Sequence, residues 1–240
     1  MTPAETQAID DARREREDEL LLLLLLMLGW AVEQPGASVD TAAGVLNRYG
    51  VDEIARTMAD AHLDGFAFYS PSGRRPNAEE LARQYEPAAG DMVDAIVATM
   101  RQTPGADLAA ILLAARYSRS DSTGLRLGAE RQVTTAGNAG LLDGAIALYG
   151  PITALRHRSV VDDRTTVICR QRDGLTLRAD DPYWLTNWPS LHFNCRSIIE
   201  ILDEPVTMSS TYPTRLPDDG FGLAPLIVRS ILRRAARDAA

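Results

Sequence analysis

The chain of 240 residues contains no lysine, and all 25 of its basic residues are arginine. A phosphate-binding loop of the G-x-x-x-x-G-K-S/T type requires a lysine, so the sequence excludes a nucleotide-driven motor that uses this loop. The H-E-x-x-H motif of zinc proteases is absent as well. With only two cysteines, Cys169 and Cys195, the chain cannot build the disulfide framework of a small secreted domain.

The sequence also lacks an apolar run long enough to cross a membrane. The leucine-rich stretch 20–32 has 13 residues, short of the ~20 that span a bilayer. The preceding residues 13–19 carry both charges, whereas a signal peptide begins with a basic segment. We therefore expect no membrane association, and we expect 20–32 to be the apolar half of a helix that is buried in a core or in an oligomer contact.

The net charge of −8 is unevenly distributed. Residues 1–100 contain 18 acidic residues and 8 arginines, whereas residues 101–200 contain 10 acidic residues and 12 arginines. This balance provides no basic arm of the kind that wraps nucleic acid, and it favours protein partners. The arginines between 156 and 196 would support weak DNA contact only if they shared one face of the molecule.

Helix start and stop signals divide the first half of the chain into helices. Thr2-Pro3 opens the first helix, and Pro35-Gly36 follows its end near residue 33. Further helices are expected at 38–49, at 51–63 after Gly50, from a cap at Asn77, and at 91–102, 106–117 and 130–149. The small residues at 136–140 would let another backbone approach closely.

The pattern changes after residue 150. The β-branched segment 152–161, the short extended segment 175–177 and the segment 197–202 predict strands, and 224–239 predicts an amphipathic helix after a polar linker. The sequence therefore predicts an α+β protein with a mainly helical N-terminal region at 1–118 and a small α+β module with a few short strands at 119–202. Residues 203–240 would form the linker and the C-terminal helix.

Two motifs in this module carry the most specific signal. The first runs from Asp162-Asp163-Arg164-Thr165 to Asp173-Gly174, and the second is the segment P-S-L-H-F-N-C-R at 189–196. Together, over roughly residues 130–202, they resemble the C-terminal module of the phage Mu F-like head-morphogenesis (minor head) proteins. The motif residues are Asp163, Arg164, Thr165, Cys169, Asp173, Gly174, His192, Asn194, Cys195 and Arg196.

This resemblance implies a structural virion protein rather than an enzyme. It implies several copies per virion, at the portal vertex or capsid interior, and assembly in the host cytoplasm. The expected partners are the portal protein and the major capsid or scaffold protein, with a role in head assembly and in DNA ejection. The alternatives are a DNA-binding ejection protein and a toxin-like enzyme delivered by the module. An enzyme would need a pair such as Cys195 and His192 to act as nucleophile and base.

The state of the two cysteines is left open by the sequence. Cysteine-rich members of the family read C-x-x-C and H-x-N-C-R-C, which looks like a zinc site, but here Arg172 and Ser197 replace two thiols. Three ligands remain, Cys169, His192 and Cys195, whereas a closed zinc site takes four, with Asp163 as a candidate. A metal-free packed core is favoured, a Cys169–Cys195 disulfide comes next and zinc last, so no cofactor is expected.

The aromatic residues Tyr183, Trp184 and Trp188 lie between the two motifs. They are expected to cover the core of the module, and the alternative is a binding interface.

Overall fold

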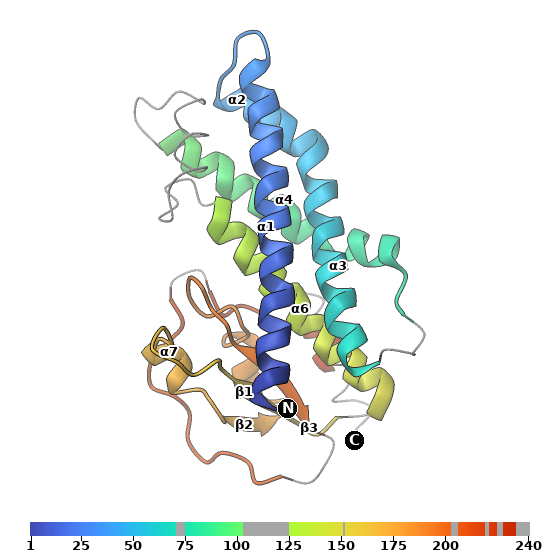
Figure 1. Cartoon of the computed structure of the whole chain (residues 1–240), viewed down its shortest axis with the longest axis vertical. Helices are drawn as coiled ribbons and strands as arrows, with labels where there is room; N and C mark the ends of the chain where they lie inside the picture. The colour runs from blue at the N-terminus through green and yellow to red at the C-terminus, as the bar shows by residue number, and fades with distance from the viewer. Residues whose placement is uncertain are drawn as a thin grey trace. The chain divides into compact units, whose positions relative to one another are not determined.

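The computed structural model describes residues 1–70, 75–102, 125–150, 152–202, 206–218, 221–224 and 228–233. Figure 1 shows the arrangement of its helices and strands. The elements are α1 (Pro3–Glu33), α2 (Val39–Val45), the π-helical turn η1 (Leu46–Gly50), α3 (Val51–Tyr69), α4 (Ala78–Gln102), α6 (Leu125–Tyr149), β1 (Ala154–Arg158), α7 (Val167–Arg170), β2 (Thr176–Arg178), the 3-10 helix η2 (Pro182–Leu185) and β3 (Ile198–Leu202). The helix expected at 106–117 lies outside the described residues. Of the C-terminal helix only 228–233 is described, and it is helical.

The chain forms two compact units. Unit 1 comprises Met1–Arg13, Asp60–Pro76 and Thr134–Ala240, and unit 2 comprises Arg14–Ala59 and Asn77–Val133. The helical N-terminal region and the small α+β C-terminal module are as the sequence predicted. The domain limits at 118 and 202 stay predictions, because each compact unit combines segments from different parts of the chain and neither unit begins or ends at these limits.

The leucine run of α1 belongs to unit 2 and has one buried and one exposed face. Leu20, Leu24 and Leu28 are fully buried, which is the spacing of one helix face. Leu22 and Leu26 are 58% and 63% exposed, so the helix is not buried on most sides. Among the described helices, none combines the length and the apolar character that crossing a bilayer requires.

Two expected helix breaks are wrong. Gly50 does not separate two helices, because η1 continues directly into α3 and Gly50 keeps a helical backbone. The helix that Asn77 caps does not stop before residue 91 either; α4 is one helix with Pro87 inside it. The cap itself is confirmed, since Glu80 N donates to Asn77 Oδ1 at 3.0 Å. Buried side chains continue along α4 on both sides of Pro87, and their burial offsets the ~3 kcal/mol that an interior proline costs.

Unit 1 contains a three-stranded antiparallel sheet with the order β2-β1-β3. In the central strand, Leu155 lies opposite Leu177 of β2 and Ile201 of β3. All three strands confirm the segments expected from the sequence. Ile152, Trp184 and Trp188, each at most 1% exposed, pack in the same core as these strands and as residues of α6.

Within unit 1, α3 and α6 touch backbone to backbone at glycines. A β-carbon added at Gly140 would lie 1.8 Å from the carbonyl oxygen of His62, and one at Gly144 would lie 2.4 Å from that of Phe66. One at Gly65 would lie 2.2 Å from the carbonyl oxygen of Gly137. The close approach expected for residues 136–140 is therefore confirmed, and α3 is the neighbouring element.

We predict that Gly140→Ala destabilises the protein by at least about 3 kcal/mol, because the added methyl group overlaps a backbone oxygen that cannot move alone. Gly90→Ala in α4 is the matched control. Its β-carbon meets no atom within 4 Å, so it should stabilise the helix by up to ~1 kcal/mol. Urea unfolding of both variants measures the two effects, and equal stabilities would contradict the α3–α6 contact.

Candidate functional site

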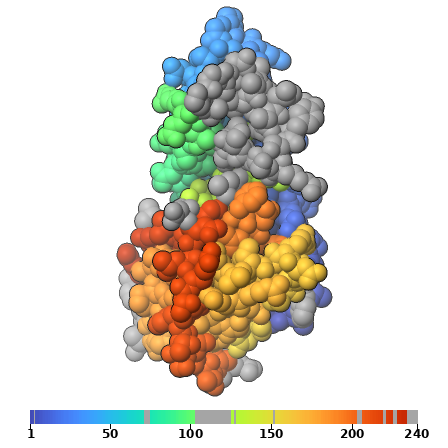
Figure 2. All heavy atoms as spheres, turned by 90° about the vertical axis from the view of Figure 1, so that its left-hand side faces the viewer, coloured from blue at the N-terminus to red at the C-terminus, as the bar shows by residue number. Residues whose placement is uncertain are grey.

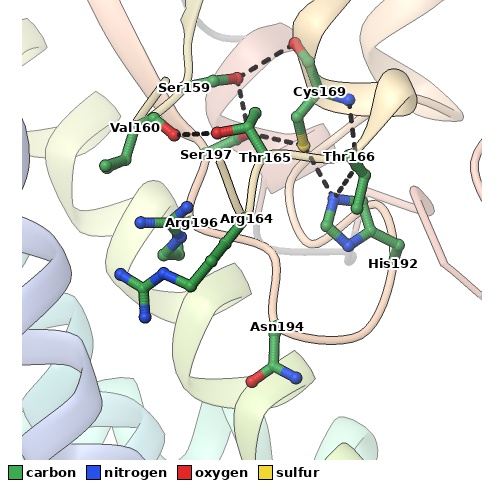
Figure 3. Close-up of a pocket in the computed structure, with 10 residues that line it drawn as sticks. All are labelled: Ser159, Val160, Arg164, Thr165, Thr166, Cys169, His192, Asn194, Arg196 and Ser197. Atoms are coloured by element: carbon green, nitrogen blue, oxygen red, sulfur yellow. Dashed lines mark hydrogen bonds between the residues drawn. The ribbon is translucent and has the colours of Figure 1, made fainter. Parts of the chain in front are cut away.

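The two sequence motifs meet in unit 1 around an open cleft. The short helix α7 carries Cys169, and Thr166 caps it by accepting the Cys169 N–H at 3.4 Å. The loop that leads into β3 carries His192 and Cys195. The cleft is partly open to solvent, and the space inside it is about that of one water molecule. It is lined by Ser159, Val160, Arg164, Thr165, Thr166, Cys169, His192, Asn194, Arg196 and Ser197 (Figure 3).

Cys169 is the centre of the site. Its Sγ lies 2.9 Å from His192 Nε2 and accepts a hydrogen bond from Ser197 Oγ at 3.0 Å (Figure 3). The same sulfur lies 3.9 Å from Cys195 Sγ. Hydrogen bonding from Cys195, together with the hydroxyls of Ser197 and Thr166, lowers the pKa of Cys169 to about 7. Burial and the neighbouring Cys169 raise the pKa of Cys195. Cys169 is therefore the thiol that ionises first.

His192 is held in one tautomer. Its Nδ1 lies 2.7 Å from the carbonyl oxygen of Phe193, which can only accept, so Nδ1 carries the proton. Nε2 is then the acceptor, and it faces Cys169 Sγ as well as Thr166 Oγ1 at 2.8 Å. His192 thus presents its lone pair to the thiol of α7.

A carboxylate and an arginine join the two motifs. The carboxylate of Asp162 accepts hydrogen bonds from both terminal nitrogens of Arg196, one of them at 2.8 Å. It also accepts a hydrogen bond from the Thr165 hydroxyl at 3.2 Å. Hydrogen bonds from Arg196 hold the pKa of Asp162 well below its usual range. Asp163, which was expected in this cluster, is exposed instead, and its neighbour Asp162 takes that role. The signal that could have found Asp162 is its position three residues before Thr165, which allows the reciprocal turn bonds seen here.

The remaining motif residues shape the turns around the cleft. Asp173 Oδ1 accepts the Ser159 N–H at 2.9 Å, and Gly174, with a φ of 81°, donates its N–H to His157 O at 2.9 Å. Arg164 lies exposed at the cleft. Asn194 adopts a φ of 56° and points away from the Cys169–His192 pair (Figure 3).

Two residues that replace thiols of the cysteine-rich members are structural centres. Arg172 is 1% exposed and donates to Ile168 O at 2.9 Å, to Asn187 Oδ1 at 2.7 Å and to Arg215 O at 2.7 Å. It thereby fixes residues 206–218, which lie on the surface in red-orange beside the gold segment that contains α7 (Figure 2). From the sequence, Arg172 was expected only to replace a thiol ligand.

Ser197 is the second of these centres. It is fully buried, and its Oγ lies 3.0 Å from Ser159 Oγ in addition to its bond to Cys169. Its carbonyl oxygen accepts from Arg13 Nη1 at 3.1 Å and from Asn138 Nδ2 at 3.4 Å. One residue thus connects β3 to α1, α6 and α7 within unit 1.

The aromatic residues between the motifs belong to the core. Trp184 and Trp188 are fully buried, and Trp184 Nε1 donates to Arg178 O at 2.8 Å. Tyr183 stacks on Tyr212 with ring centroids 5.4 Å apart. The interpretation as a core cover is confirmed for both tryptophans.

The three possible metal ligands converge but do not fit a closed zinc site. Ligand atoms of Cys169, His192 and Cys195 lie within 4.8 Å of one another, and the two sulfurs have almost the ~3.8 Å separation of thiolates on tetrahedral zinc. Asp163, the candidate fourth ligand, is not in this group. Arg172 also places a buried positive charge near Cys169, which opposes a second cation.

The α+β module thus brings both sequence motifs together at one cleft. A family model described as Phage Mu protein F like protein matches residues 77–200, more than half of the chain. The chain therefore belongs to the phage Mu F-like family and is a head-morphogenesis protein of the virion. The match begins before α4, whereas the motifs alone indicated residues 130–202. Searches of curated proteins and of solved structures found no significant match.

We predict that Asp162→Asn lowers the melting temperature, because it leaves the guanidinium of Arg196, which is 8% exposed, without its anion. Asp163→Asn is the matched control one residue away, and it should change stability by no more than ~0.5 kcal/mol. Thermal unfolding followed by circular dichroism measures both variants. A larger loss in Asp163→Asn would show that the wrong carboxylate has been assigned.

We also predict that His157 makes the fold acid-sensitive. Its side chain in β1 is fully buried, and burial, followed by the charges of Arg172 and His192, lowers its pKa to about 3. The unfolded chain takes up this proton below pH ~6.5 but the folded chain does not, so stability falls as the pH drops from 6.5 toward 3.

Between pH 7 and pH 5 this group should cost about 2 kcal/mol. His157→Gln, which does not titrate, should lose that part of the pH dependence. Urea unfolding at both pH values, followed by the fluorescence of the buried tryptophans, tests this. Identical pH dependence in the wild type and the variant would contradict it.

Proposed function

We propose that this protein is a minor head protein that binds the portal protein during head assembly, with the capsid or scaffold protein as further partners, and that its role is structural. The observation that supports this proposal most directly is the family match over residues 77–200. The site agrees with a structural role, since Cys169, His192 and Cys195 are at most 4% exposed. This degree of burial keeps a large substrate, such as a peptide or a nucleic acid, away from the three side chains.

The surface that we assign to the partner lies on α1 in unit 2. Leu22, Leu26 and Trp30 follow one another at intervals of four residues and are 58%, 63% and 46% exposed. Trp30 also contacts Tyr49 edge to face, with ring centroids 5.4 Å apart, which holds the indole in place. An apolar stripe with this spacing suits a helix that lies in a partner's groove.

The arginines of the module give less support to the alternative of a DNA-binding ejection protein. Arg156 and Arg158 both bind the buried carboxylate of Glu200, at 3.3 and 2.8 Å. Arg178 binds Asp180 through two nitrogens, each at 2.8 Å. With Arg172 and Arg196 also engaged within the protein, these side chains do not form one patch of free positive charge, which DNA binding would require.

We predict that replacing Leu22, Leu26 and Trp30 together by Gln weakens binding to the portal protein of the same phage at least tenfold. The three side chains lie on the surface, so the fold should keep its melting temperature within a few degrees. Leu216→Gln is the matched control, because Leu216 is 76% exposed but belongs to unit 1.

Binding is measured by surface plasmon resonance with purified portal protein, and in parallel with capsid protein. Unchanged affinity in the triple variant would contradict the assigned surface. Failure of the wild type to bind either partner, together with DNA binding that weakens steeply with salt, would favour the ejection alternative.

A further inference from the structure

We infer that Cys169 and Cys195 form a site of reversible oxidation, in which a small hydroperoxide converts the pair into a disulfide that links the two motifs covalently. The two sulfurs lie 3.9 Å apart, whereas a disulfide bond measures about 2.05 Å. Both side chains pack in one cluster with Ile168 and Leu191, so each sulfur meets the other rather than a thiol of another molecule. This inference depends on the virion location but not on the contact with the portal.

The surroundings of the two cysteines differ, which fixes their order of reaction. Cys169 lines the cleft together with His192 and Ser197, whereas Cys195 is not among the residues that line it. An oxidant in the cleft therefore meets Cys169 first. Cys195 does not line the cleft, but its sulfur lies 3.9 Å from that of Cys169 and can form the disulfide once Cys169 is oxidised.

The small size of the cleft limits which oxidants can reach the two sulfurs. Both cysteines are 3% exposed, and the space inside the cleft is about that of one water molecule. Only an oxidant of a few atoms, such as hydrogen peroxide, can approach Cys169 there, whereas the disulfide of a thiol-containing peptide is far too large. We therefore assign a small hydroperoxide as the co-reactant.

The first step forms a sulfenic acid. The sulfur of Cys169 attacks the terminal oxygen of the hydroperoxide, so that an S–O bond forms and the O–O bond breaks. His192 Nε2, 2.9 Å from the sulfur, accepts the thiol proton and passes it to the departing oxygen, which leaves as an alcohol or as water.

The second step forms the disulfide. Cys195 Sγ attacks Cys169 Sγ, an S–S bond forms, the S–O bond breaks, and the hydroxide leaves as water with the proton of Cys195. The two thiols have then given two electrons to the peroxide, which balances the reaction. A thiol reductant reverses the change.

The change of compartment makes this chemistry useful to a virion protein. The host cytoplasm keeps thiols reduced, so heads assemble with the thiol pair, whereas a released virion meets oxidants outside the cell. The bond would tie α7 to the loop that leads into β3, at the cleft where both motifs meet. The module would thus gain a covalent link only after assembly is complete.

The test uses the full chain, reduced and freed of reductant, and then exposed to hydrogen peroxide. The expected result is an intact mass lower by 2 Da, the loss of both thiols counted in denaturant, and a melting temperature higher by about 5 °C. A reductant should restore all three values. An unchanged mass, or oxidation that yields only cross-linked dimers, would overturn the inference.

Two single variants test the order of reaction. In Cys195→Ala the reaction should stop at the Cys169 sulfenic acid, which dimedone traps as a stable adduct, and no disulfide should form. In Cys169→Ala the remaining thiol should react at least tenfold more slowly than Cys169 does in the wild type. Equal rates in the two variants would overturn the assigned roles.

A metal measurement on the same sample separates this inference from the competing zinc site. Elemental analysis should find well under one zinc per chain before oxidation. One zinc per chain, with both thiols protected from peroxide until a chelator is added, would overturn the inference in favour of a metal centre. None of these results depends on whether the portal protein binds, so the two proposals fail or succeed separately.

Discussion

Unit 1 depends on the hydrogen bonds that converge at Ser197. Its carbonyl group accepts hydrogen bonds from Arg13 of α1 and Asn138 of α6, and its hydroxyl group contacts Cys169 and Ser159, which follows β1. A buried polar group that lost these partners would cost far more than one such bond contributes. The start of β3, the position of α7 and the shape of the cleft are therefore fixed together.

Arg172 plays the corresponding part on the other side of α7. Its guanidinium binds three oxygen atoms from separate segments, which resembles the way a metal ion gathers ligands from separate segments. Hydrogen bonds from Arg172 and Ser197 therefore hold α7, the segment 206–218 and the start of β3 in place around the two cysteines.

The sequence was informative where one physical signal dominated. The short extended segments located the three strands, and the small residues of α6 indicated a close helix contact. The sequence did not predict that the helices on either side of Gly50 are continuous, nor that the helix capped by Asn77 continues through 91–102, because local propensity is weaker than the burial of a continuous apolar face. The sequence also favoured Asp163 over Asp162, because two adjacent acidic residues cannot be told apart by type. Only the hydrogen bonds between Thr165 and Asp162 in the structure distinguish them. The structural role of Arg172 was missed, because its three oxygen partners follow no sequence spacing that could have predicted them.

The backbone contact between α3 and α6 limits which residues this chain can carry at two positions of α6. A side chain at the protein surface can be replaced with little change in stability. Gly140 and Gly144 have no such freedom, because a β-carbon at either position would overlap a carbonyl oxygen of the neighbouring helix. The distance between the axes of α3 and α6 is therefore set by two side chains that the sequence leaves out.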